Sequence, residues 1–230
     1  MATKLQNTVQ IIEGYWREHP AWFGRTYGEY LHLGANQEML RLMLKGVSIL
    51  PETRILDVST GLGGNARWLA SLYGSKVDAV DRFKPAIVCA RQLAKTQGVA
   101  DLCQFAVQTT PELPYSEGTF DLAVTAEDES AWPEVARVLK EGGIAVGSQV
   151  AADGVRKLEA TLAGAGFEVL ELVDVTDYAL AFYKAKEAEA TLLLNGGLMS
   201  TEDVQSLQMY TVDLYEAGGA SHVIFRLAKR

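Results

Sequence analysis

A glycine-rich segment between two aspartates is the part of the sequence best suited to bind a charged ligand. Residues 55–64 are Ile-Leu-Asp-Val-Ser-Thr-Gly-Leu-Gly-Gly, and Asp81 ends the next apolar run. Glycines at a turn from a strand to a helix let the backbone approach a ligand closely, and the helix N-terminus presents free N–H groups. Gly61 and Gly63 also fit a loose dinucleotide-binding pattern, which is weak evidence by itself. The segment therefore indicates a nucleotide-like ligand. The two acids help to decide whether that ligand is negatively or positively charged.

Asp57 argues against a diphosphate at this turn. It lies four residues before Gly61, where the pyrophosphate of a dinucleotide would be nearby. Two like charges about 4 Å apart near a protein surface repel each other by about 1–4 kcal/mol. S-Adenosylmethionine carries an ammonium, a sulfonium and a single carboxylate, so an acid beside glycine N–H groups suits it better. A nicotinamide-dependent oxidoreductase is the weaker alternative.

Asp81 supports an adenosyl ligand without choosing the cofactor. A carboxylate at the end of a second strand can accept hydrogen bonds from both hydroxyls of a ribose, and NAD enzymes use the same device. A solvated acid at the end of a strand is the alternative interpretation. Asp78 faces the opposite side, and we expect it to be such a solvated acid.

The elements that position these residues follow from the hydrophobic pattern. Short apolar runs alternate with longer helical ones from residue 53 onward, which predicts a largely parallel sheet covered by helices on both faces. We expect strands over 54–58, 76–80, 102–107, 120–124, 144–150, 167–175 and 222–227. We expect helices over 1–18, 36–45, 64–73, 84–97, 132–139, 154–163 and 202–215.

Four segments in order resemble the consecutive motifs of class I S-adenosylmethionine-dependent methyltransferases. They are residues 55–64, Val-Asp-Ala-Val-Asp at 77–81, Leu-Pro-Tyr-Ser-Glu-Gly-Thr-Phe-Asp at 113–121 and Glu-Val-Ala-Arg-Val-Leu-Lys-Glu-Gly-Gly at 134–143. The sequence is similar to the small-molecule branch, such as sarcosine/dimethylglycine and ubiquinone/menaquinone-biosynthesis methyltransferases. The resemblance implies an α/β fold with a Rossmann-like doubly wound seven-stranded sheet, an antiparallel last strand, N-terminal helices and a helical insertion before that strand.

The resemblance also implies how the cofactor would lie. Residues 57–63 would hold its methionine part, Asp81 its ribose, and the residues after Asp81 its adenine. Ser59 stands where the family usually has its first glycine, and we expect it to be tolerated. Thr109 replaces the usual aspartate and would be a weaker acceptor for the adenine amino group. The implied cofactor-binding residues are Asp57, Ser59, Thr60, Gly61, Gly63, Asp81, Arg82, Phe83, Thr109, Thr110, Thr125 and Ala126.

Few residues are candidates for binding or activating the methyl acceptor. Transfer from a sulfonium needs mainly alignment, and a general base is needed only if the nucleophile arrives protonated. His32 could be that base or a structural histidine, and Glu127 could act similarly at the C-terminal rim of the sheet. Glu129 could bind a cationic acceptor or belong to a solvated acidic turn. The aromatic residues that could form a cage or a lid, or simply pack, are Trp22, Tyr27 and Tyr30.

The composition excludes several function classes. A net charge of −8 disfavours binding to nucleic acid, which needs a basic face. Residues 1–10 lack the apolar stretch of a signal peptide, and no apolar run is long enough to span a membrane, so we expect a cytoplasmic protein. Cys89 and Cys103 lack metal-ligand spacing and are expected to be buried reduced thiols.

The chain length fits a single domain. We expect this domain to have four parts and to be a monomer or a homodimer. We expect a helical cap over 1–50, a cofactor-binding core over 51–175, an insertion that covers the substrate over 176–218, and the final strand over 219–230. The leading hypothesis is an enzyme that methylates a small molecule. A non-catalytic S-adenosylmethionine-binding partner or sensor stays open because no base is evident.

Overall fold

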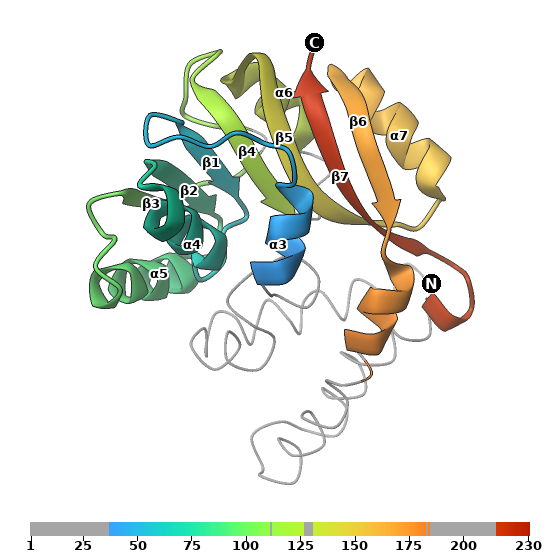
Figure 1. The fold of residues 1–230 in the computed structure, drawn as a ribbon, viewed down its shortest axis with the longest axis horizontal. Coiled ribbons are helices and arrows are strands. Elements are labelled where there is room, and N and C mark those ends of the chain that lie inside the picture. Colours follow the sequence, from blue (N-terminus) through green and yellow to red (C-terminus); the bar gives the residue numbers. More distant parts are fainter. Residues whose placement is uncertain (1–36, 111, 127–130, 183, 185–214) are drawn as a thin grey trace, which may run out of the picture.

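A single seven-stranded sheet with the strand order β3-β2-β1-β4-β5-β7-β6 organises the chain (Figure 1). The structure is a computed structural model and describes residues 37–110, 112–126, 131–182, 184 and 215–230. The strands are β1 (Ile55–Val58), β2 (Val77–Asp81), β3 (Cys103–Val107), β4 (Phe120–Ala126), β5 (Leu139–Ala151), β6 (Phe167–Asp174) and β7 (Ser221–Lys229). The helices are α3 (Gln37–Met43), α4 (Gly64–Tyr73), α5 (Lys84–Thr96), α6 (Trp132–Val138) and α7 (Val155–Gly164), and residues 176–182 are also helical.

The direction of the last strand confirms the predicted fold class. Strands β1 to β5 pair in parallel, whereas β7 lies antiparallel between β5 and β6. The central strand β1 has β2 on one side and β4 on the other, so the strand order reverses there. In open α/β sheets, ligands bind outside the carboxyl ends of the strands at such a reversal. The glycine-rich turn follows β1 and therefore lies at this position.

Helices cover both faces of the sheet and give two hydrophobic cores. Helices α3, α4 and α5 contribute Leu40, Leu69 and Ile87 to the core on one face. Helices α6 and α7 contribute Trp132 and Leu162 to the core on the other face. Figure 1 shows these two layers of helices with the sheet between them. No helix in the described part of the chain is long and apolar enough to cross a bilayer.

The start of β5 differs from the prediction. We expected a helix over 132–139 and a strand from residue 144, but β5 begins at Leu139, which pairs with Phe120 of β4. The register of this pairing shifts between Phe120 and Leu122. Gly142 and Gly143 lie between the expected helix and strand, where a break would fall. Gly142 instead adopts a φ of 71° within the strand and allows an irregular strand to continue.

An ion pair on helix α6 holds the turn that contains Leu113 and Tyr115. Arg137 Nε donates to Glu134 Oε1 at 2.7 Å, and the same guanidinium donates to the carbonyls of Leu113 and Tyr115 at 3.0 and 2.7 Å. Glu134 Oε2 accepts a further hydrogen bond from the Leu113 N–H at 2.9 Å. The hydrogen bond from Arg137 is the main reason why the pKa of Glu134 falls from 4.5 to about 2.

The Glu134–Arg137 pair and its hydrogen bonds to residues 113–115, called here the α6 clamp, predict a loss of stability in acid. Glu134 contributes stability above pH 4.5, the value of its unfolded state, and this contribution disappears as the pH falls towards 2. The free energy of unfolding, measured with urea from pH 2 to 6, should therefore fall more steeply for the wild-type protein than for Glu134→Gln. Parallel curves for the two proteins would contradict the clamp.

Candidate functional site

The turn after β1 is bent tightly by three residues with left-handed backbone angles. Ser59, Gly61 and Gly63 have φ values of 58°, 56° and 74°. The Thr60 N–H donates to the carbonyl of Val80 at 2.9 Å, which ties the turn to β2. A left-handed conformation costs a non-glycine residue about 1–2 kcal/mol. Ser59 therefore adopts, with strain, the conformation that a glycine at this position would adopt freely.

Asp57 is a completely buried carboxyl in the last part of β1. Its Oδ2 accepts a hydrogen bond from the Thr60 hydroxyl, whereas its Oδ1 has no hydrogen-bond partner. Burial raises the pKa of this carboxyl to about 7, although Thr60, Asn65 and the Ala66 N–H counteract that rise. The negative charge of Asp81 raises it further. The site therefore contains a buried acid that lacks a positively charged partner among the described residues.

Asn65, in the first turn of α4, is a site residue that the sequence analysis missed. Its side chain is buried close to Asp57, and its Oδ1 also has no hydrogen-bond partner. Two neighbouring buried acceptors without donors suit a ligand group that supplies several N–H bonds. An asparagine directly after the glycines was the available signal, but helix N-termini often contain asparagine for capping alone.

Asp81 is also buried, and it braces the turn from the end of β2. Its Oδ2 accepts a hydrogen bond from the Gly61 N–H at 2.8 Å, and its Oδ1 accepts one from the Phe83 N–H at 2.8 Å. Burial raises the pKa of Asp81, against the lowering effect of these hydrogen bonds. Each carboxylate oxygen can accept a second hydrogen bond, so Asp81 can hold the turn and still bind two hydroxyl groups.

The residues predicted to border the adenine follow β2 and β3. Arg82 is exposed, and its guanidinium lies 4.8 Å from the centre of the Phe83 ring. Thr109 is exposed and Thr110 is half-buried, in the segment after β3. The Gln108 N–H donates to the Asp81 carbonyl at 2.9 Å, so this segment leaves the sheet beside the end of β2.

The end of β4 closes the site on its other side. Thr125 is fully buried, its hydroxyl has no hydrogen-bond partner, and Ala126 is the last residue of the strand. A Cβ at Gly147 of β5 would lie 2.3 Å from the Thr125 carbonyl oxygen, so only glycine fits there. Outside the described residues lie all of the residues predicted for the acceptor: His32, Glu127, Glu129, Trp22, Tyr27 and Tyr30.

One minor prediction needs correction. Asp78 is not solvated: it is buried within β2, and its Oδ2 pairs with the Arg54 guanidinium at 3.1 Å. His222 is also buried, and its Nδ1 lies 2.6 Å from the Tyr215 hydroxyl. The backbone N–H of His222 also donates to Thr176 Oγ1 at 2.9 Å. His222 thus joins β7 to the segments on both sides of residues 183–214.

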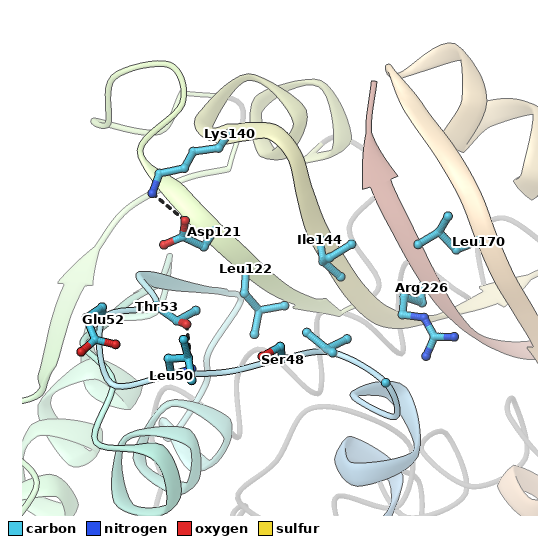
Figure 2. Close-up of a pocket in the computed structure, with 12 residues that line it drawn as sticks. Ser48, Leu50, Glu52, Thr53, Asp121, Leu122, Lys140, Ile144, Leu170 and Arg226 are labelled. Atoms are coloured by element: carbon cyan, nitrogen blue, oxygen red, sulfur yellow. Dashed lines mark hydrogen bonds and ion pairs between the residues drawn. The ribbon is translucent and has the colours of Figure 1, made fainter.

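A groove of about 600 Å³ opens at the other end of the sheet (Figure 2). It lies between residues 46–53 and the first residues of β4, and none of the predicted site residues lines it. Three of its charged side chains are already paired, since Lys140 Nζ lies 2.5 Å from Asp121 Oδ1, and Arg226 lies 2.9 Å from Glu171 Oε2. The buried acids at the glycine-rich turn are therefore the stronger candidate site.

Comparison with protein families agrees with this location. A family model described as a methyltransferase domain matches residues 55–143, which include the turn, both acids and the α6 clamp. Residues 55–143 therefore resemble a methyltransferase domain. A glycine/sarcosine/dimethylglycine N-methyltransferase of Actinopolyspora halophila is a relative that is 32% identical over 133 residues, or 54% of this chain and 24% of that protein. The matched segments span 24% to 33% of the length of the first curated relatives.

Solved structures share the fold of this chain and match more of it than the family model does. The phosphoethanolamine N-methyltransferase 2 of Haemonchus contortus, solved with S-adenosylmethionine, has a TM-score of 0.77 and 17% identity over 94% of this chain and 57% of that chain. The cyclase SpnF has a TM-score of 0.71 and 21% identity over 84% of this chain and 80% of that chain. Since a cyclase shares this fold, the reaction must be argued from the site.

Proposed function

We propose that the protein is an S-adenosylmethionine-dependent methyltransferase that acts on a small-molecule acceptor. The observation that carries the proposal is the pair of buried acids, Asp57 and Asp81, on either side of the turn 59–63. A cationic nucleoside supplies positive charge beside this pair, whereas a diphosphate would add negative charge. Relatives that methylate small amines, such as the sarcosine/dimethylglycine N-methyltransferase of Halorhodospira halochloris, support the choice of acceptor class.

The residues of this site fit the methionine and ribose parts of the cofactor. The buried oxygens Asp57 Oδ1 and Asn65 Oδ1 lack donors, and an ammonium group supplies three. Asp81 keeps one free acceptor position on each carboxylate oxygen, which suits the two hydroxyls of a ribose. When bound, S-adenosylmethionine would supply an activated methyl group. The chain's own part is to orient that group and to exclude water.

The acceptor side of the proposal rests on the sequence. His32 and Glu127 are the proposed catalytic residues, and Trp22, Tyr27, Tyr30 and Glu129 are proposed to contact the acceptor. Incubation with methyl-labelled S-adenosylmethionine and a panel of glycine, sarcosine, a tocopherol and a sterol tests the reaction. Labelled product from a panel member supports the proposal. Binding of the cofactor without transfer to any acceptor would favour a binding partner or sensor instead.

Replacement of Asp81 by alanine should weaken the binding of S-adenosylmethionine by about tenfold or more. Hydrogen bonds to a charged group contribute about 1.5–3 kcal/mol, and each 1.4 kcal/mol changes an affinity by about tenfold. The variant also loses the acceptor for the Gly61 N–H, which loosens the turn itself. Isothermal titration calorimetry measures the dissociation constant, and circular dichroism verifies the fold.

Asp78→Ala is the matched control because Asp78 is also buried in β2 but pairs with Arg54, away from the turn. This variant should lose stability and keep its affinity for the cofactor within about twofold of the wild-type value. Equal affinities of wild type and Asp81→Ala would mean that the ribose does not lie at Asp81.

A further inference from the structure

Among the described residues, the buried side chains of Asp57 and Asn65 (the Asp57 cluster) offer more hydrogen-bond acceptors than the donors around them fill. A carboxylate has room for about four hydrogen bonds; Asp57 Oδ2 accepts one from the Thr60 hydroxyl, and the Asn65 side chain and the Ala66 N–H lie near enough to lower the pKa of Asp57 as well. The second oxygen, Oδ1, is buried without a partner, and so is the neighbouring Asn65 Oδ1. An ionised carboxylate that is buried without a cation is strongly unfavourable. A proton on Asp57 removes the charge and adds an O–H donor to a cluster that has too many acceptors.

The charged and titratable groups around Asp57 do not compensate its charge. Asp81, on the adjacent strand β2, carries the same sign of charge and adds repulsion. On β3, burial raises the pKa of the Cys103 thiol to about 12, so this group is neutral. Arg67 of α4 donates to Gln97 Oε1 at 2.6 Å and to the Leu62 carbonyl at 3.3 Å, and Arg82 lies exposed beyond Asp81. Among the described residues, no cation forms an ion pair with Asp57.

We propose that Asp57 carries a proton in the ligand-free protein and releases it to solvent when the ammonium group of S-adenosylmethionine binds. The proposal rests on the proposed function and adds one proton to its binding equilibrium. The O–H bond of the carboxylic acid breaks, the proton passes to water, and the N–H groups of the ammonium replace it as donors to the carboxylate. Cofactor binding is then linked to pH by a residue of the binding site itself.

The pH dependence of proton release distinguishes a proton lost by Asp57 from one lost by the ligand. The pKa of Asp57 is about 7, so at pH 6 most protein molecules carry the proton. An α-amino group has a pKa of about 7.7–8.0, so the ligand is already protonated at pH 6 and contributes no proton there. We therefore expect nearly one proton released per cofactor bound at pH 6. At pH 8, Asp57 is already ionised, and this release should be close to zero.

Carbon-13 NMR of the full chain labelled at its aspartate carboxyl groups tests the proposal directly. Comparison with Asp57→Asn assigns the Asp57 resonance, and that resonance should titrate near pH 7 in the ligand-free protein. Saturating S-adenosylmethionine at pH 6 should move it to the position of an ionised carboxylate. Calorimetry in buffers of different ionisation enthalpy counts the protons released. The Asp78 resonance, assigned with Asp78→Asn, is the control and should not respond to the cofactor.

The possible failures can be told apart. An Asp57 carboxyl that stays ionised in the ligand-free protein down to pH 5 would overturn the proposal. So would cofactor binding at pH 6 that leaves the resonance unchanged and releases no proton. If calorimetry detects no binding of S-adenosylmethionine at any pH, the proposed function fails, and this proposal fails with it.

Discussion

The Asp57→Asn variant should be more stable than the wild-type protein at pH 8 and should bind S-adenosylmethionine about 10–100-fold more weakly. The loss of affinity follows from the replacement of a charge-assisted hydrogen bond to the ammonium, worth about 1.5–3 kcal/mol. The gain in stability follows because asparagine is never charged. Its carbonyl can still accept from Thr60, and its amide can donate where Oδ1 of Asp57 has no partner.

The pH dependence of this stability effect has a definite sign. The carboxyl has a pKa of about 7 in the folded protein and 3.8 in the unfolded chain, so the folded state binds its proton more tightly. The contribution of Asp57 to stability is complete below pH 3.8 and is lost as the pH rises to about 7. Between these pH values the unfolded chain releases its proton while the folded protein keeps it, and this lowers the free energy of unfolding by about 4 kcal/mol in all, as an order of magnitude.

Urea unfolding of both proteins at pH 5 and pH 8 measures this difference. The advantage of Asp57→Asn should be larger at pH 8 than at pH 5, so each protein is its own control for other effects of the substitution. Calorimetric titration at pH 8 gives the affinity for S-adenosylmethionine. A variant that is less stable than wild type at pH 8 would show that the buried carboxylate is well compensated. Unchanged affinity would show that Asp57 does not contact the cofactor.

The fold could be predicted from the sequence because its signals are local. The helix expected over 64–73 has the same bounds as α4, since glycines flank a run of good helix formers at both ends. The strand expected over 167–175 ends within one residue of β6. The start of β5 could not be predicted, because glycine usually marks a break and only the pairing of Leu139 with Phe120 extends the strand.

The site could be predicted in part, and its missing features are non-local. Asp57 and Asp81 stand out because acids at the ends of apolar strands are unusual in a core. The pairing of Asp78 with Arg54 joins residues 24 positions apart, and no sequence pattern indicates it. Asn65 could not be distinguished from a capping residue until the fold placed it beside Asp57. Sequence patterns thus located the acids, whereas only three-dimensional packing shows which of them lacks a partner.

The Gly63→Ala variant should lower the free energy of unfolding by about 2–4 kcal/mol. Gly63 caps α4 with a φ of 74°, a conformation that costs alanine about 1–2 kcal/mol. A Cβ there would also lie 2.4 Å from Cε1 of Phe105 and 3.1 Å from the Ala90 Cβ. Overpacking of this kind typically costs about 1–3 kcal/mol. Urea unfolding measures the loss, and a displaced α4 should weaken S-adenosylmethionine binding because the helix carries Asn65.

Gly98→Ala separates the two causes of this loss. Gly98 has nearly the same φ, 72°, but a Cβ there would meet no atom within 4 Å. This control should lose only the backbone part, about 1–2 kcal/mol. Adding Phe105→Leu to Gly63→Ala should cost less than the sum of the two single changes, because a smaller side chain leaves room for the new methyl group. Equal losses for the two alanine variants, or an additive double variant, would mean that Phe105 does not press against the turn. Contact between β3 and the turn would then not fix the position of the turn.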